Sequence, residues 1–171
     1  MRTGQNSAVL FIFLLICQIA LCNFAHLGPY IMPSILPAMI MCIPLSVSTT
    51  LCMLIAFVSG LSVDWLSEGL IGINAASLIP VALARKTLIR VILGEDMINR
   101  MDSFSIRKNG LGKILTLMIA AGIIFLVIYV ILDGAGTRPF WFNVSRFWLS
   151  LAINTGLAIL IADILSPDDR K

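Results

Sequence analysis

Apolar stretches long enough to cross a membrane alternate with short polar or glycine- and proline-rich breaks along the whole chain. Thr3 to Val63 contains no Asp, Glu, Lys or Arg, and further charge-free runs cover Gly69–Ala84, Ile114–Leu132 and Phe147–Ala162. A helix that crosses the hydrocarbon core of a bilayer needs about 20 predominantly apolar residues. The pattern therefore predicts several membrane-spanning helices.

The breaks divide the chain into six predicted spans within a single transmembrane domain, 1–171. The second span contains Pro33, Pro37 and Pro44, and proline removes a backbone hydrogen bond from a helix interior. This span is therefore expected to be kinked or irregular, which lipid tolerates only where neighbouring helices satisfy the freed backbone groups. The predicted fold class is an all-α integral membrane protein with six transmembrane helices, at about 7–27, 30–45, 51–65, 71–93, 112–132 and 143–165.

Composition supports the membrane class. Hydrophobic residues make up 59% of the 171 residues, charged residues 12%, and the mean hydropathy is +1.01. An ordinary soluble domain is about 45–50% apolar and about 25% charged. These values exclude a soluble enzyme and a disordered chain. The first apolar run is too long for a typical signal peptide, and its removal would leave an odd number of spans, so we expect it to stay as a span.

The basic residues predict an orientation. The connection Arg85–Lys113 holds seven of the 12 basic residues, and with six spans it lies on the same side as both termini, which hold three more. Only Arg138 and Arg146 fall on the other side. Cytoplasmic segments carry an excess of Lys and Arg, so we expect a bacterial inner membrane protein with both termini in the cytoplasm. Aromatic residues typical of the interface fall at the outer level, among them Trp65, Trp141 and Trp148.

The basic connection also has an apolar side. Its apolar residues are spaced to share one helical face over about 94–111, which predicts a short amphipathic helix on the inner leaflet. Arg100, Arg107 and Lys108 are the candidate contacts to anionic lipid or to a partner. A solvated loop that only sets the topology is the alternative reading.

Few residues inside the spans are able to carry chemistry. The four cysteines lie in apolar runs without metal-site spacing, a single histidine cannot complete a zinc site with them, and no nucleotide or hydrolase motif is present. We therefore predict no metal, no cofactor, no nucleic-acid binding and no enzymatic activity. Asp64 and Arg146 share the outer level, so they are expected to form an ion pair that fixes the third span against the sixth. An acid–base pair or a proton relay is the alternative, although a relay needs titratable groups deep in the membrane.

Small and amide side chains predict close packing between helices. Ala56 with Gly60 and Ala152 with Gly156 stand four residues apart, a spacing that lets helix backbones approach closely. They would serve either internal packing or the helix of a partner. Gln18, Asn23, Asn74 and Asn154 would either bond between helices or line a small-molecule pocket.

The end of the third span and the start of the fourth carry a family resemblance. Gly60-Leu61-Ser62-Val63-Asp64-Trp65, followed by Gly72-Ile73-Asn74, resembles the MreD family of rod-shape-determining membrane proteins. In that family a span ends in Gly-Xaa-Xaa-Xaa-Asp, and Gly-Xaa with a polar residue opens the next span. The start of the chain, with the proline-rich second span, resembles the Bacteroidetes-type members at Gln18, Asn23 and His26-Leu27. Chain length, hydropathy and the basic loop between the fourth and fifth spans agree with the family along most of the chain. The turn at Leu45–Thr50 departs from the family because it lacks a basic residue.

The resemblance implies a function that composition does not show. Members are non-enzymatic inner-membrane scaffold subunits of the cell-elongation complex, which supports cell shape and lateral peptidoglycan synthesis. They pair with the membrane-anchored MreC and act near MreB-like filaments, a RodA-type glycosyltransferase and its transpeptidase. Their fold is similar to the substrate-binding S-component of energy-coupling-factor transporters. Carried over by position, Gly60, Asp64, Gly72 and Asn74 are expected to support the fold or the contact with the MreC-like partner.

Two other functions remain as alternatives. A vitamin-binding S-component of a transporter would have a similar fold and size. Such subunits usually carry Ala-Xaa-Xaa-Xaa-Ala in the first helix, whereas Ala8, Ala20 and Ala25 do not have that spacing. A small membrane enzyme would need polar residues clustered at one interface, for which only the outer group Asp64, Glu68, Asp133 and Arg146 offers candidates.

Overall fold

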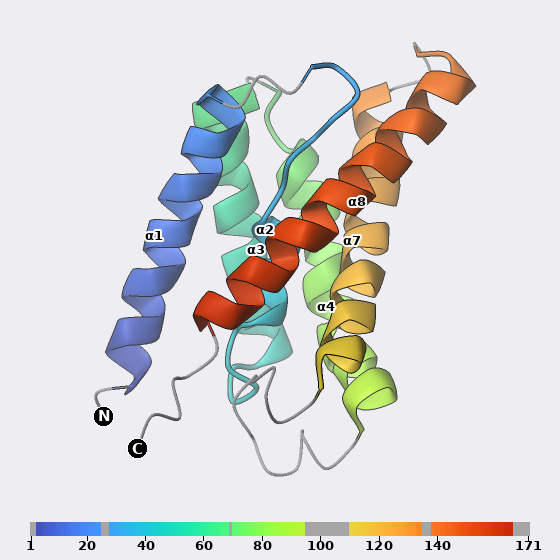
Figure 1. The fold of residues 1–171 in the computed structure, drawn as a ribbon. Coiled ribbons are helices and arrows are strands. Elements are labelled where there is room, and N and C mark those ends of the chain that lie inside the picture. Colours follow the sequence, from blue (N-terminus) through green and yellow to red (C-terminus); the bar gives the residue numbers. More distant parts are fainter. Residues whose placement is uncertain (1–2, 25–27, 69, 95–109, 135–137, 166–171) are drawn as a thin grey trace.

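The structure, a computed structural model, is a bundle of helices and describes residues 3–24, 28–68, 70–94, 110–134 and 138–165 (Figure 1). Within those ranges the regular secondary structure is entirely helical. The elements are α1 (Thr3–Phe24), α2 (Leu36–Met41), α3 (Thr49–Val63), the single wide turn η1 (Asp64–Glu68), α4 (Ile73–Leu93), α7 (Leu111–Gly134) and α8 (Phe140–Leu165).

The helices have the length and surface expected of a helical membrane protein. Three stretches, Thr49–Ser67, Leu111–Gly134 and Phe140–Ile161, are long and apolar enough to cross a membrane, and Ala8–Phe24 is a shorter apolar helix. Large apolar side chains are exposed on the outside of the bundle, including Phe13 of α1, Leu54 of α3 and Trp148 of α8. Such a surface suits a lipid solvent better than water, because monomeric soluble proteins rarely expose large contiguous apolar areas.

Five of the six predicted spans coincide with a long helix, and the second differs. Residues 30–45 were expected to be kinked or irregular, and they hold only the six-residue helix α2, entered through an extended segment. The predicted amphipathic stretch at 94–111 lies almost wholly outside the described residues, because 95–109 are not described.

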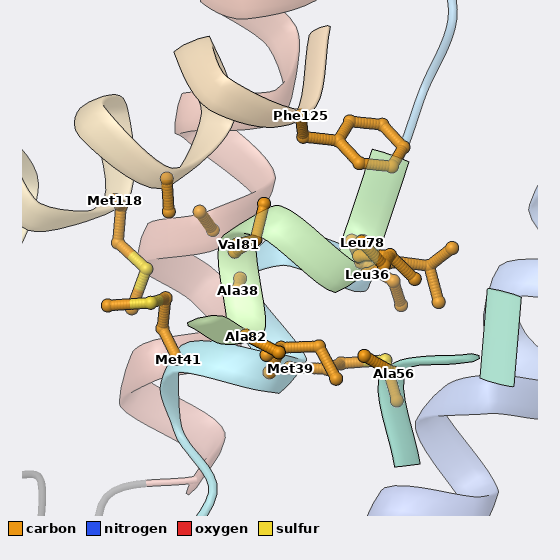
Figure 2. Packing of buried hydrophobic residues seen from close by; sticks show 14 of the residues in the cluster. Leu36, Ala38, Met39, Met41, Ala56, Leu78, Val81, Ala82, Met118 and Phe125 are labelled. Carbon is orange, nitrogen blue, oxygen red and sulfur yellow. The ribbon is translucent and has the colours of Figure 1, made fainter. Parts of the chain in front are cut away.

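Helix α2 forms the centre of the bundle. All six of its residues are buried, and Leu36, Met39, Ile40 and Met41 are at most 1% exposed. Figure 2 shows α2 side chains among residues of the neighbouring helices, among them Ala56 of α3, Leu78 of α4 and Phe125 of α7. A helix that is apolar on all sides is stable only inside a protein or a membrane. The short helix α2 is therefore the core around which the longer helices pack.

The extended segment that leads to α2 obtains its hydrogen bonds from side chains. The Gln18 side chain of α1 accepts from the Ile35 amide (2.8 Å) and donates to the Pro33 carbonyl (3.2 Å). From α8, Ser150 Oγ accepts from the Met32 amide (2.9 Å) and Asn154 Oδ1 from the Ser34 amide (2.8 Å). Proline has no amide hydrogen, so every backbone donor from residue 32 to 35 has a partner. The expected use of Gln18 and Asn154 between helices is thus confirmed.

The other end of α2 is held by a buried cation. Arg85 of α4 is 1% exposed, and its guanidinium donates to the backbone carbonyls of Met41 (3.4 Å) and Ile43. Carbonyls at the end of a helix have no partner within the helix and carry partial negative charge. Arg85 therefore supplies hydrogen-bond donors to the backbone carbonyls where α2 ends. Helix α4 continues beyond Arg85 to Leu93.

We expect Gln18→Leu to destabilise the protein by about 1–2 kcal/mol, because two buried backbone groups lose their partners. Asn23→Leu on the same helix is the control, since the bonds that Asn23 donates to Ile19 and Leu66 are exposed. It should change the unfolding free energy by less than about 0.5 kcal/mol. Thermal unfolding in detergent compares the two variants, and equal losses would contradict the central role of the extended segment.

Candidate functional site

Four residues of the predicted motif meet at the junction where α3 and η1 pass into α4. Gly60 lies against the start of α4: a Cβ at Gly60 would stand 2.5 Å from Ala75 Cα and 2.6 Å from Ala75 N. Real Cβ atoms essentially never come so close to backbone. Gly60 therefore lets the two helices approach more closely than any residue with a side chain would allow.

Asp64 binds the first turn of α4. One carboxylate oxygen accepts from the amides of Gly72 (2.9 Å) and Ala75 (3.3 Å), and the other accepts from the Asn74 amide (3.0 Å) and from Asn74 Nδ2 (2.9 Å). Gly72 has a φ of +104°, a conformation that glycine adopts without steric cost and that starts the helix here. Gly60, Asp64, Gly72 and Asn74 thus form one structural unit, called the α3–α4 junction below.

At the α3–α4 junction, the side chain of Asp64 caps the N-terminus of α4 although it lies several residues before that helix in the sequence. The first amides of a helix lack partners within the helix, and the helix dipole makes that end attractive to an anion. Asp64 satisfies three such amides and is 0% exposed, and Asn74 is equally buried. A carboxylate engaged by four donors and closed to solvent is poorly suited to act as a general base, so this geometry favours a structural role.

The expected ion pair between Asp64 and Arg146 is not the one that forms. Arg146, on α8, pairs with Asp133 near the end of α7, and Arg138 also contacts Asp133 at 3.2 Å. Arg146 lies over the ring of Tyr129, with its guanidinium carbon 5.6 Å from the centroid. The sequence predicts one membrane level for Asp64 and Arg146, but residues at one level need not face each other around the bundle. The ion pair fixes α8 against α7, which precedes it, and not against α3.

The remaining candidates divide between those outside the described residues and those that sequence reasoning overlooked. Arg100, Arg107 and Lys108 lie outside the described residues. Among the residues that the structure describes, no three His, Cys, Asp or Glu side chains gather as metal ligands would. Arg85 was assigned to the basic connection, although it is buried in α4. A basic residue that continues an apolar helical run was the available signal for it.

The structure separates the two uses of the small residues. Ala56 is fully buried and Gly60 contacts α4, so this pair serves internal packing. Ala152 and Gly156 of α8 are exposed, and a Cβ at Gly156 would meet nothing within 4 Å. The same spacing therefore lies inside the bundle in α3 and on its surface in α8.

Gly60→Ala and Gly156→Ala test this contrast with the same substitution. Gly60→Ala should destabilise the protein by about 1–3 kcal/mol, because the helices have to separate. Gly156→Ala should be neutral or stabilising by up to about 1 kcal/mol, since alanine favours helix more than glycine does. Thermal unfolding of both variants decides the matter, and a stable Gly60→Ala protein would show that the close approach is not required.

Arg146 and Arg138 share Asp133 but differ in exposure. Arg146→Gln should cost about 3 kcal/mol or more, because Asp133 and its buried surroundings lose the main charge partner. Arg138→Gln should cost less than about 1 kcal/mol, as is typical of solvent-exposed pairs, since the Arg138 side chain is 37% exposed. Unfolding free energies of the two variants are the measurement, and the reverse order would contradict this assignment.

Comparison of the chain with models of known families, with curated proteins and with solved structures found no match in any of the three. The resemblance to the MreD family therefore stays a prediction from the residues themselves. These are the motif Gly60, Asp64, Gly72 and Asn74, which the structure gathers into the α3–α4 junction, together with the layout of apolar spans and basic connection.

Proposed function

We propose that the chain is a non-enzymatic scaffold subunit of a bacterial cell-elongation complex, an MreD-type protein of the inner membrane. The observation that carries the proposal is the α3–α4 junction. The four residues that resemble the family motif come together there through the bonds of Asp64 and the close approach at Gly60. Four motif residues that contact one another in the structure support the resemblance more strongly than four residues matched by sequence position alone.

The proposed topology has six spans with both termini in the cytoplasm. Helix α1 begins, α4 ends, α7 begins and α8 ends at the same end of the bundle (Figure 1). Lys86, Arg90 and Lys113 belong to these helix ends, whereas the exposed Trp65 and Trp141 belong to the opposite end. The positive-inside rule assigns the basic end to the cytoplasm. The broken second span, with α2 at its centre, counts as one crossing in this scheme.

A binding role agrees with how the buried charged groups are used. Asp64 accepts from the start of α4, Arg85 donates to the end of α2, and Arg146 pairs with Asp133. Each of these groups holds two segments of the fold together. A catalytic acid or base would need a titratable group open to substrate, and these three are at most 8% exposed. Function is then expected at the outer surface of the bundle, through contacts with other proteins.

The proposed partners follow from the family resemblance. The direct partner is an MreC-like protein with a single membrane anchor, and the indirect ones are MreB-like filaments, a RodA-type glycosyltransferase and its transpeptidase. The apolar exposed faces of the bundle offer area for a membrane-anchored partner. The α3–α4 junction supports those faces by fixing the distance between α3 and α4.

Depletion in a rod-shaped host that depends on the gene is the test. We expect cells to become round, and the tagged protein to capture an MreC-like protein after crosslinking in membranes. The variant Asp64→Asn should lower protein abundance and partner capture together, because it weakens the helix cap. Normal rods after depletion would refute the proposal. Loss of shape with full abundance and full partner capture in Asp64→Asn would instead point to chemistry at Asp64.

A further inference from the structure

An open groove of about 470 Å³ lies on the surface where α3 faces α4. Six of its lining residues come from α3 and the residue before it, and one comes from α4. The lining is mainly apolar, with two hydroxyl residues at one end: Ser48, Thr50, Leu51, Met53, Leu54, Phe57 and Ile79. Leu54 and Phe57 are 57% and 43% exposed, so the groove opens outward from the bundle. It lies along Thr49–Ser67, a stretch able to span the membrane.

The hydroxyl end of the groove lies at the basic end of the bundle. Helices α3 and α4 run in opposite directions with Gly60 against Ala75. Ser48, twelve residues before Gly60, is therefore level with Thr87, twelve residues after Ala75. Lys86 is therefore at the height of the hydroxyl residues. Seven residues separate it from Ile79, which places both on the same face of α4 and about 10 Å apart along the axis.

The lining of the groove is therefore mainly apolar with hydroxyl groups at one end, and helix geometry sets Lys86 of α4 at the height of that end. An amphiphile with an apolar tail and an anionic head matches this arrangement, because the tail would contact the apolar lining and the head would lie near the hydroxyl groups and Lys86. From this match we propose that the groove binds an anionic phospholipid, with an acyl chain along Leu54, Phe57 and Ile79 and the phosphate at Lys86.

Charge and shape favour a lipid over the helix of a partner. A transmembrane helix with its side chains is about 10–12 Å wide and needs a broad face, whereas this groove is lined almost wholly by one helix. A helix would also place an apolar segment beside Lys86, whose charge a phosphate satisfies directly. Basic residues next to a membrane surface contribute about 1 kcal/mol each to the attraction of anionic lipid. The lipid site does not depend on the proposed scaffold role.

Lipid retention by the purified full-length protein tests the site. The protein is equilibrated with equal amounts of phosphatidylglycerol and phosphatidylcholine in nanodiscs, extracted mildly, and the lipids that stay bound are measured by mass spectrometry. The unmodified protein should retain phosphatidylglycerol preferentially. Lys86→Gln should lower that preference by about fivefold, the factor that corresponds to one basic residue near the lipid surface.

Two matched controls separate the groove from general effects. Lys113→Gln removes the same charge at the same end of the bundle, from an exposed position on α7, and should leave the preference unchanged. Leu54→Trp should fill the groove and lower retention of both lipids, whereas Leu160→Trp, at a similarly exposed leucine on α8, should not. Thermal unfolding of each variant identifies any that fails to fold.

Several outcomes would overturn the proposal. They are no preference in the unmodified protein, equal losses for Lys86→Gln and Lys113→Gln, or unchanged retention in Leu54→Trp. If Leu54→Trp leaves lipid retention unchanged and abolishes capture of a membrane-anchored protein from cells, the groove is a helix-docking site and the lipid assignment is wrong. The scaffold proposal, by contrast, is tested by cell shape after depletion, and its failure would not change the interpretation of the lipid measurements.

Discussion

The whole fold depends on satisfying a stretch of non-helical backbone in the middle of an apolar bundle. Lipid offers no hydrogen bonds to backbone groups, so a broken span is stable only if the protein supplies every partner. Gln18 from α1 and Ser150 and Asn154 from α8 bond the segment that enters α2, and Arg85 from α4 bonds the segment that leaves it. Three helices far apart in the sequence are thereby tied to one central element, and α2 fills the core between them.

The same requirement explains where the scarce charged groups lie. Asp64 satisfies the start of α4 as Arg85 satisfies the end of α2, so one anion and one cation each cap a helix end from another part of the chain. Arg146 and Asp133 neutralise each other between neighbouring helices. Charged groups used in this way stabilise particular connections, and their burial keeps them away from any substrate. The buried charged groups are thus committed to the fold itself.

The position of the helices along the chain could be predicted from the sequence, whereas their position around the bundle could not. The apolar runs located the long helices, the prolines located the broken span, and the spacing of Gly60, Asp64, Gly72 and Asn74 located the α3–α4 junction. The predicted partner of Arg146 was wrong because Asp64 and Asp133 each lie where an apolar helix ends, and hydropathy does not say which helix is adjacent to α8. Arg85 was overlooked for a related reason, since only the fold brings the end of α2 beside α4.

The small residues show why stability and recognition are separable in this fold. The backbone of Ala75 packs directly against Gly60, so a side chain at position 60 would disturb the core. Gly156 has open space where its Cβ would be, so the same change alters only the outer face of α8. A pattern read from the sequence alone gives both positions equal weight. Because the bonds that hold the central segment use none of these surface positions, changes on the exposed faces of α3 and α8 are able to alter binding while the central segment and its partners stay intact.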